Sequence, residues 1–545
     1  MKPRLPDDIL HLLCEELVER RDFGTLFSCC CVAKSLAMPA LAGLYRGQHL
    51  SSIKSRDSDP TSLAEQDLVV QRWSIQWRSI VLSALDKTLL PYCRYLRVLD
   101  LGDLEMLFEE SRFQPGGKIF NHLARYNIPM PTGPLVKTRS GKPRPPRLNF
   151  SAIFEAIADD IIPKAPNLER VDGPRSLAGT AFVRWLPSLS KLRFLKVFDG
   201  NVLDDCRIPS IIGNNCPKFE SLSIFMWIGP KCDQNLAAIL SAIPNDTLRS
   251  FATFSRTQFG SETCLALNNH GASLKVLELQ LENAVVPQLG VLKDCTALES
   301  IKLTDAGGGI DLKTNNDAIA GIVSWLLSCH KLHTLTLHNF TSGAVLATPV
   351  LLSDRIRLED LEIDSYTESD QDSFHRALLN QTSLQCLLLD GEEVQTRDSL
   401  DIFVHSIEQL KQLRSLKMVS VSNSFNDQHI CGIAEQLENL EHLYIGGLGL
   451  QDVSLESMAN LKNLQSVSFS GLTSFTMDGF LELIGRLGPG NKGLVLTVDN
   501  ANPDDGLSEE EQTFVRNALI EAVDGRFEYI YMRDPNMSEF EGESD

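Results

Sequence analysis

Residues 413–418 read LRSLKM, and the same pattern, L-x-x-L-x-[LIVF], returns along most of the chain with occasional apolar exchanges. It stands clearly at eleven places, which begin at Leu96, Leu192, Phe219, Leu274, Leu298, Leu332, Leu358, Leu384, Leu413, Leu440 and Leu464. Weaker copies begin at Leu168 and Leu248, and from Leu168 onward successive copies stand 24 to 34 residues apart. Alternating apolar positions indicate a short strand buried on one face. Their regular return predicts a stack of such strands.

The segments between these strands have a different periodicity. Residues 401–409, 427–436 and 477–486 carry apolar side chains at three- and four-residue spacing, which predicts helices. A strand and a helix repeated with a period in the mid-twenties are the signature of leucine-rich repeats. Since one repeat cannot bury its apolar edge alone, stacking must supply the core. We therefore predict the fold class α/β, a leucine-rich-repeat solenoid (horseshoe), closed by strand-like residues 493–498 and 527–531.

Composition restricts the partners and the compartment. The 545-residue chain has a net charge of −20, which argues against nucleic acid or an anionic membrane as partner. No run of 18 apolar residues stands in the sequence, so no membrane span is expected. The 13 cysteines form no C-x-x-C pair and read as free thiols of a reducing compartment, cytoplasmic and/or nuclear. Basic residues within about 129–147 are either a nuclear-import signal or a solvated loop.

The first 46 residues read as three short helical runs. Leu5-Pro6 opens the first, and acidic residues 7 and 8 suit its first turn. Ile9, Leu10, Leu13 and Leu17 follow at helical spacing and predict one apolar stripe. The third run is interrupted at Pro39. Helices this short and this apolar cannot hide all of their apolar surface alone, so part of that surface is expected to meet a partner.

This N-terminal pattern resembles an F-box, in particular the F-boxes of filamentous fungi. The family's LP-x-[DE]-[IL]-L start matches Leu5, Pro6, Asp8, Ile9 and Leu10, and its D-x-x-x-L segment matches Asp22 and Leu26. Its C-x-V-x-[KR] element and its closing P-x-L-Y-R are approximated by residues 31–34 and 39–46. Leu36 departs from the family, which usually has Trp or Phe there. Cys216, Cys295 and Cys329, each three residues before a repeat, resemble the cysteine-containing repeats common in F-box proteins.

The resemblance implies a substrate receptor of an SCF-type cullin–RING ubiquitin ligase. Its F-box would bind the ligase adaptor, and through it the cullin, while the repeats bind an unknown protein target. The expected adaptor-binding residues are Leu5, Pro6, Ile9, Leu10, Leu13, Leu17, Leu26 and Val32. Such a subunit is not an enzyme, and we predict no catalytic residue, metal or cofactor. The alternative is that these helices only seal the end of the repeat domain.

Outward positions of the strands predict where a target binds on the concave face. Phe194, Phe198, Phe225 and Phe254 fall on three neighbouring repeats, with Trp227 just beyond, and exposed aromatic residues are favoured at binding hot spots. A covering loop from the preceding insertion is the alternative. Further along, Asp360, Glu362, Asp364 and Asp390 form an acidic group that favours a cationic partner or is simply solvated.

The predicted organisation has four parts. They are an F-box-like adaptor-binding domain at 1–47, a helical linker or cap at 48–95, the solenoid at 96–535 with a Pro- and base-rich insertion at about 129–147, and an acidic disordered tail at 536–545. Two other functions stay open. One is a leucine-rich-repeat scaffold without a ubiquitin-ligase role, and the other is a GTPase-activating protein of the Ran type, which would begin directly with regular repeats.

Overall fold

The computed structural model describes residues 6–48, 63–111 and 149–531, apart from short gaps at 176, 178, 283–284, 308–315, 341, 367–370, 392–396, 423, 448, 472 and 502–505. Leu5, the insertion predicted at 129–147 and the tail predicted at 536–545 lie outside these residues. The chain divides into two compact units, Met1–Ser273 and Leu274–Asp545. In the part of the chain that is described, no helix has both the length and the apolar character needed to cross a membrane.

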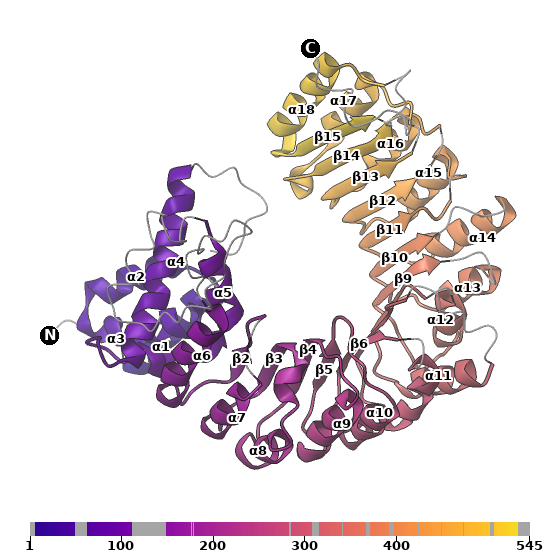
Figure 1. Cartoon of the computed structure of the whole chain (residues 1–545). Coiled ribbons are helices and arrows are strands. Elements are labelled where there is room, and N and C mark those ends of the chain that lie inside the picture. Colours follow the sequence, from indigo (N-terminus) through magenta and orange to yellow (C-terminus); the bar gives the residue numbers. More distant parts are fainter. Residues whose placement is uncertain are drawn as a thin grey trace, which may run out of the picture. The chain divides into compact units, whose positions relative to one another are not determined.

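The first unit begins with helices and continues with repeats. Its helical part comprises α1 (Asp7–Glu19), α2 (Phe23–Val32), α3 (Lys34–Arg46), α4 (Leu63–Ala84) and the 3-10 turn η3 (Tyr92–Tyr95). Five strands follow, each paired in parallel with the next. They are β1 (Val98–Asp100), β2 (Arg170–Asp172), β3 (Phe194–Asp199), β4 (Ser221–Met226) and β5 (Ser250–Thr253). Between them lie α5 (Leu101–Glu109), α6 (Phe150–Ile161), η6 (Ile162–Lys164), α7 (Ala181–Trp185), η7 (Leu186–Ser188), η8 (Gly200–Leu203), α8 (Ile208–Asn215), α9 (Cys232–Ala242), α10 (Ser261–Leu267) and η9 (Asn268–His270). The helices line one side of the strands (Figure 1).

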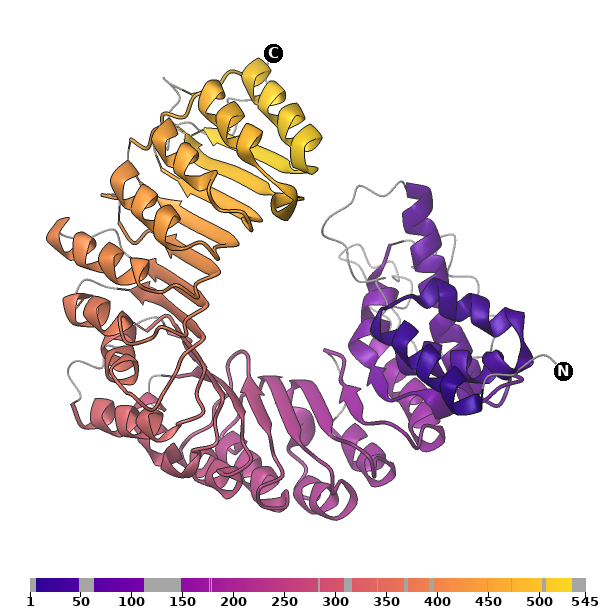
Figure 2. The same cartoon turned by 180° about the vertical axis from the view of Figure 1, so that it is seen from behind.

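The second unit repeats the same strand-and-helix order. Its parallel strands are β6 (Val276–Leu281), β7 (Ser300–Asp305), β8 (Thr334–His338), β9 (Asp360–Tyr366), β10 (Cys386–Gly391), β11 (Ser415–Val419), β12 (His442–Gly446), β13 (Ser466–Ser470), β14 (Val495–Ala501) and β15 (Arg526–Tyr531). The return segments are η10 (Val286–Asp294), α11 (Asn316–Ser328), α12 (Gly343–Leu351), α13 (Gln371–Leu378), α14 (Arg397–Glu408), α15 (Asp427–Gln436), α16 (Asp452–Met458), α17 (Met477–Arg486), η12 (Pro489–Asn491) and α18 (Glu509–Val523). Seen from behind, the helices of this unit again flank one side of its strands (Figure 2).

These strands confirm the predicted α/β leucine-rich-repeat solenoid. Every clear and weak copy of the sequence pattern contains a strand, and β14 and β15 coincide with the two segments expected at its end. Their apolar residues stand in register, as in the buried row Leu387, Leu416, Leu443, Val467, Leu496 and Phe527. Because side chains alternate across a strand, this register buries the leucines against the helices and turns the residues between them outward.

In several repeats the residue three positions before the strand pattern is buried and links neighbouring repeats. Cys216, Cys295 and Cys329 are fully buried at this position, and the Cys329 thiol lies 3.4 Å from the carbonyl oxygen of Cys295. Gln381 and Asn491 take the same position in later repeats, where their side-chain amides donate to backbone carbonyls of the preceding repeat. Small or amide side chains therefore recur there because they satisfy buried backbone groups.

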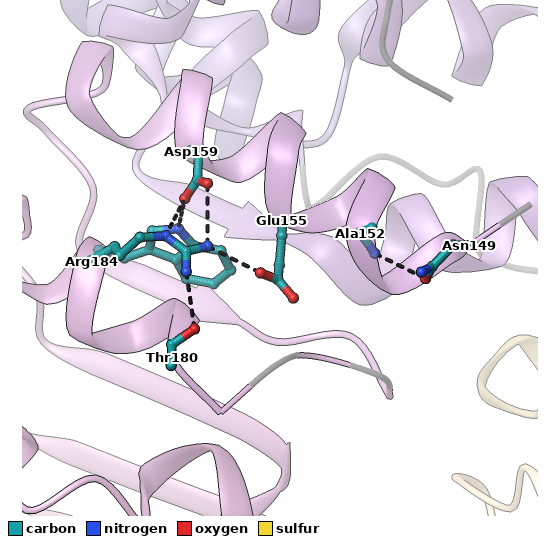
Figure 3. Close-up of polar contacts among 7 residues, drawn as sticks. Asn149, Ala152, Glu155, Asp159, Thr180 and Arg184 are labelled. Atoms are coloured by element: carbon teal, nitrogen blue, oxygen red, sulfur yellow. Dashed lines mark hydrogen bonds and ion pairs between the residues drawn. The ribbon is translucent and has the colours of Figure 1, made fainter. Parts of the chain in front are cut away.

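Ion pairs on the helix side connect α6 with α7 (Figure 3). The Arg184 guanidinium lies 3.0 Å from Glu155 and 3.2 Å from Asp159, and it donates to the Thr180 hydroxyl at 3.2 Å. The Trp185 indole donates to Asp159 at 2.6 Å. Exposed pairs of this kind contribute about 0–1 kcal/mol each, so the network orients these helices more than it stabilises them.

The buried cysteines should resist alkylation. Burial raises the pKa of Cys216, Cys264 and Cys329 to about 12, so at neutral pH these thiols stay protonated and are poor nucleophiles. Cys31 and Cys206 are exposed. We expect iodoacetamide to modify these two within minutes on the native chain, before the three buried ones, as followed by mass spectrometry of tryptic peptides. Equal labelling rates for Cys329 and Cys206 would contradict this packing.

Candidate protein-binding surfaces

The N-terminal helices α1, α2 and α3 share a small core. Its buried members are Cys14 and Val18 of α1, Leu26 of α2 and Ala40 of α3, with Leu17 partly buried against them. Leu10, two turns before Leu17 on α1, is buried as well. Three residues that were expected to bind an adaptor, Leu10, Leu17 and Leu26, are therefore wholly or partly occupied by internal packing.

Helix α1 is nevertheless apolar on a second side. Ile9, Leu12 and Leu13 are 41%, 60% and 44% exposed, and their i, i+3, i+4 spacing places them next to one another on the helix surface. The predicted single stripe is thus divided, with Leu10 facing inward and Ile9 and Leu13 outward. Leu12 belongs to the outward group and was missed by sequence reasoning. The sequence feature that could have identified Leu12 is its position three residues after Ile9, which places both on the same side of a helix.

Helices α2 and α3 add exposed apolar side chains of their own. Phe27, Val32 and Met38 are 65%, 75% and 45% exposed. Single exposed apolar residues are ordinary on protein surfaces, whereas large exposed apolar patches mark interaction sites. Here six exposed apolar residues lie on three consecutive short helices. We call Ile9, Leu12, Leu13, Phe27, Val32 and Met38 the apolar N-terminal surface. Of the predicted adaptor-binding residues it contains Ile9, Leu13 and Val32, and Pro6 is exposed just before it.

The same helices are attached to the start of the repeats. The Tyr45 ring stacks on Tyr92 with centroids 4.6 Å apart, and its hydroxyl hydrogen-bonds with Ser79 at 2.7 Å. Burial raises the pKa of Tyr45 to about 12. On α4, two indoles, Trp73 and Trp77, both donate to one Asp103 oxygen of α5, at 2.9 and 2.8 Å. These contacts hold α3, α4 and α5 together within the first unit. The N-terminal helices are thus attached to the first repeat and still expose apolar side chains.

Aromatic side chains gather on the outward face of β3 to β5. Phe194, Phe225 and Phe254 are 37%, 36% and 38% exposed. Phe198 and Phe225 stack with centroids 4.4 Å apart and an angle of 11° between the rings. Strand register places Phe198, Phe225 and Phe254 in one row, with Phe194 four residues before Phe198 on β3. The structure thus places the four predicted aromatic residues at outward positions on three neighbouring repeats and brings Phe198 and Phe225 into ring contact. We call these four residues the aromatic face.

Trp227 does not belong to the aromatic face, contrary to expectation. Its side chain is fully buried, and its indole donates to Asp204 at 3.2 Å. The regular strand ends at Met226, and beyond it Trp227 pairs with Thr257 only through an isolated bridge. The strict alternation of outward and inward side chains therefore no longer applies at Trp227.

The four predicted carboxylates of the second unit lie on the outward face of β9 and β10 and are half-buried. His338 of the neighbouring strand lies 2.7 Å from Asp364 and 3.8 Å from Glu362, while Asp360 accepts a hydrogen bond from the Thr334 hydroxyl at 3.1 Å. Burial, with repulsion from Asp364, raises the pKa of Asp390 above its ordinary value. Three of these carboxylates therefore already have partners on β8, which sequence spacing did not predict.

Comparison with known proteins identifies no family. No family model and no curated protein matches the chain. Similar solved structures include an internalin of Listeria monocytogenes, with a TM-score of 0.32, 14% identity and coverage of 67% of this chain and 82% of that chain. They also include the yeast complex of Rad7 and Elc1, with a TM-score of 0.40, 16% identity and coverage of 75% and 94%. Both TM-scores lie below 0.5, so the fold rests on the repeats and their strand register.

Proposed function

We propose that this chain is the substrate-recognition subunit of an SCF-type cullin–RING ubiquitin ligase, of the F-box/leucine-rich-repeat type that its N-terminal sequence resembles in filamentous fungi. The apolar N-terminal surface would bind the adaptor, and through the adaptor the cullin. The outward face of the repeats, the aromatic face in particular, would bind the target protein. The observation that carries the proposal is the second, exposed apolar side of α1, at Ile9, Leu12 and Leu13.

Physical chemistry supports a partner at this surface. The inward side of α1, with Cys14 and Val18, packs on α2 and α3, whereas Ile9, Leu12 and Leu13 on its other side stay exposed. Covering an aliphatic side chain contributes roughly 1.5–3 kcal/mol before the costs of association. A bound protein therefore explains the second apolar side of α1. The alternative, in which the helices only seal the end of the repeat domain, does not explain it.

In this role the chain acts by tethering. Binding adaptor and target at once raises the effective concentration of target lysines near the ubiquitin-charged enzyme of the ligase. The residues of this chain would bind and orient, and the transfer of ubiquitin would take place on other subunits.

An affinity purification tests the proposal. We expect the full chain, added to cell extract, to retain the adaptor and the cullin, and a variant lacking residues 1–47 to retain neither. Circular dichroism should show that the repeats of the variant stay folded. Proteins retained by both are target candidates. If the full chain retains neither adaptor nor cullin, the scaffold function is left, and a GTP-hydrolysis assay with Ran-type GTPases tests the remaining alternative.

A further inference from the structure

An open cavity of about 440 Å³ lies on the outward face of β11, β12 and β13, three neighbouring strands of the second unit (Figure 1). Its volume falls in the range of ligand sites, about 300–1,000 Å³. Three serines, a lysine, a histidine and a tyrosine line it. None of the described residues that line it is Asp or Glu, although the chain as a whole has a net charge of −20.

Strand register arranges these six polar side chains in two rows across the three strands. The first row is Ser415, His442 and Ser466, and the second is Lys417, Tyr444 and Ser468. Because neighbouring strands lie about 4.8 Å apart, each row brings three side chains next to one another. All six are at least partly exposed, so a bound group has access to both rows.

Each of these side chains can donate a hydrogen bond, through a hydroxyl, an imidazole N–H or the ammonium of Lys417. Within the described part of the chain, none of the six makes a side-chain hydrogen bond or an ion pair with another residue. Their donors are therefore available to a ligand. Hydrogen bonds to an ionised acceptor are roughly twice as strong as those to a neutral one, so these donors favour an anion.

The neighbouring strands do not neutralise the charge of Lys417. Its register partners are Leu388 on β10 and Tyr444 on β12. Asp390, the outward carboxylate of β10, lies two residues beyond Leu388. Burial and the charge of Asp364 raise the pKa of Asp390, so this carboxylate is not held in its charged form by an ion pair with Lys417.

Carboxylates lie around the cavity and direct an acidic ligand into it. Glu441, directly before His442, has the Arg414 guanidinium as its partner at 3.3 Å. The acidic group of β9 and β10 begins on the strand next to β11 and would repel a further carboxylate. The outward face of the second unit thus disfavours an anion on β9 and β10 and favours one on β11 to β13.

We propose that this cavity binds the side-chain carboxylate of an Asp or Glu of the target protein, with Lys417 as its ion-pair partner and the hydroxyls of Tyr444 and Ser468 as donors beside it. The inference rests on the proposed role as a substrate receptor and specifies the target segment: an acidic residue with an apolar neighbour. Leu388 of β10 and Val495 of β14 are half-buried apolar side chains in register with Lys417 and Ser466, and that neighbour would pack on one of them.

A carboxylate fits this cavity better than a phosphate. Phosphorylated segments are usually recognised by clusters of arginines, and none of the described residues that line the cavity is an arginine. One lysine with several hydroxyl donors suits a group that carries a single negative charge.

A peptide selection with a counter-selection tests the inference on the full chain. Random twelve-residue peptides, displayed on phage through their C-termini and therefore without a free terminal carboxylate, are first passed over immobilised Lys417→Glu chain. Those that do not bind are then selected on the unmodified chain. We expect the recovered peptides to carry Asp or Glu beside an apolar residue. Recovery of no peptide, or of neutral or basic peptides, would overturn the inference.

The best peptide, synthesised with a C-terminal amide and measured by fluorescence anisotropy, gives the size of the effect. Lys417→Glu should weaken its binding about tenfold or more, because an attraction becomes a repulsion. Tyr444→Phe removes only a hydroxyl and should weaken it about threefold. The matched control is Lys331→Glu, the same change at an exposed position before β8, which should leave affinity within about twofold. Equal losses for Lys417→Glu and Lys331→Glu would exclude a direct contact.

An exchange of charges and a phosphorylated peptide complete the test. A peptide with Lys in place of the acidic residue should bind Lys417→Glu more tightly than the unmodified chain, and the difference should shrink at high salt. A phosphoserine at that place that binds about tenfold tighter than the acidic residue would contradict the assignment to a carboxylate. A chain that binds the adaptor but no acidic peptide contradicts only this inference, whereas the reverse result contradicts only the ligase proposal.

Discussion

The double substitution Leu12→Asp and Leu13→Asp should abolish binding of the adaptor and leave the repeats folded. Both side chains are exposed, at 60% and 44%, so the isolated chain loses no core packing. An interface that covers them would lose roughly 1.5–3 kcal/mol per leucine and would bury two unpaired carboxylates. Affinity should therefore fall by about three orders of magnitude or more. Co-purification with purified adaptor, or titration calorimetry, measures this.

The matched control is Leu89→Asp. Leu89 is 97% exposed in the first unit but lies outside the N-terminal helices, so the same change of residue type should leave adaptor binding within about twofold. Leu10→Asp is unsuitable as a test, because Leu10 is buried and its replacement would unfold the helices themselves. If the double variant binds the adaptor as tightly as the unmodified chain, the apolar N-terminal surface is not the adaptor site.

The second large effect concerns stability at Gln381. This fully buried side chain accepts a hydrogen bond from the Leu358 amide at 2.8 Å and donates to the carbonyls of Leu351 and Ile356 at 2.9 and 3.3 Å. Gln381→Ala would leave three buried backbone groups without a partner, each at a cost of about 1–3 kcal/mol. We expect the free energy of unfolding to fall by roughly 3 kcal/mol or more, seen as a lower urea midpoint.

A local measurement and a neighbouring residue make this prediction specific. Hydrogen exchange of the peptide that contains the Leu358 amide should accelerate in Gln381→Ala, because that amide loses its acceptor. Asn380→Ala is the matched control: it also removes a side-chain amide, but from an exposed position, and should change stability by about 0.5 kcal/mol at most. Equal midpoints for the two variants would show that the buried amide contributes nothing.

The strands of the repeats were predictable because their pattern has a period of two. In LRSLKM at 413–418, a shift of the strand by one residue would turn both Leu416 and Met418 from the core to the solvent. Only one register therefore buries these two side chains. The same alternation placed Phe194, Phe225 and Phe254 on the outward face, where they are exposed, together with Phe198, which is half-buried and stacks on Phe225. It failed at Trp227, one residue beyond β4, where the strand and its alternation have ended.

The N-terminal helices were predictable as helices but not in their orientation. Their spacing allows an apolar residue to face either of two sides, and α1 has apolar residues on both. Which side packs inward depends on where Leu26 and Ala40 lie, and those residues belong to other helices. Leu10 was therefore assigned to a binding surface from sequence although it belongs to the core.

The sequence by itself determined the repeat, the strand register within it and the acidic net charge of the chain, because these follow from periodicity and composition. Only the tertiary structure decided which apolar residues of α1 stay exposed and that His338 lies between two predicted carboxylates. The physical reason is that these features join residues far apart in sequence. Their proximity depends on how whole elements pack, and the local pattern of one element carries no information about the side chains of another.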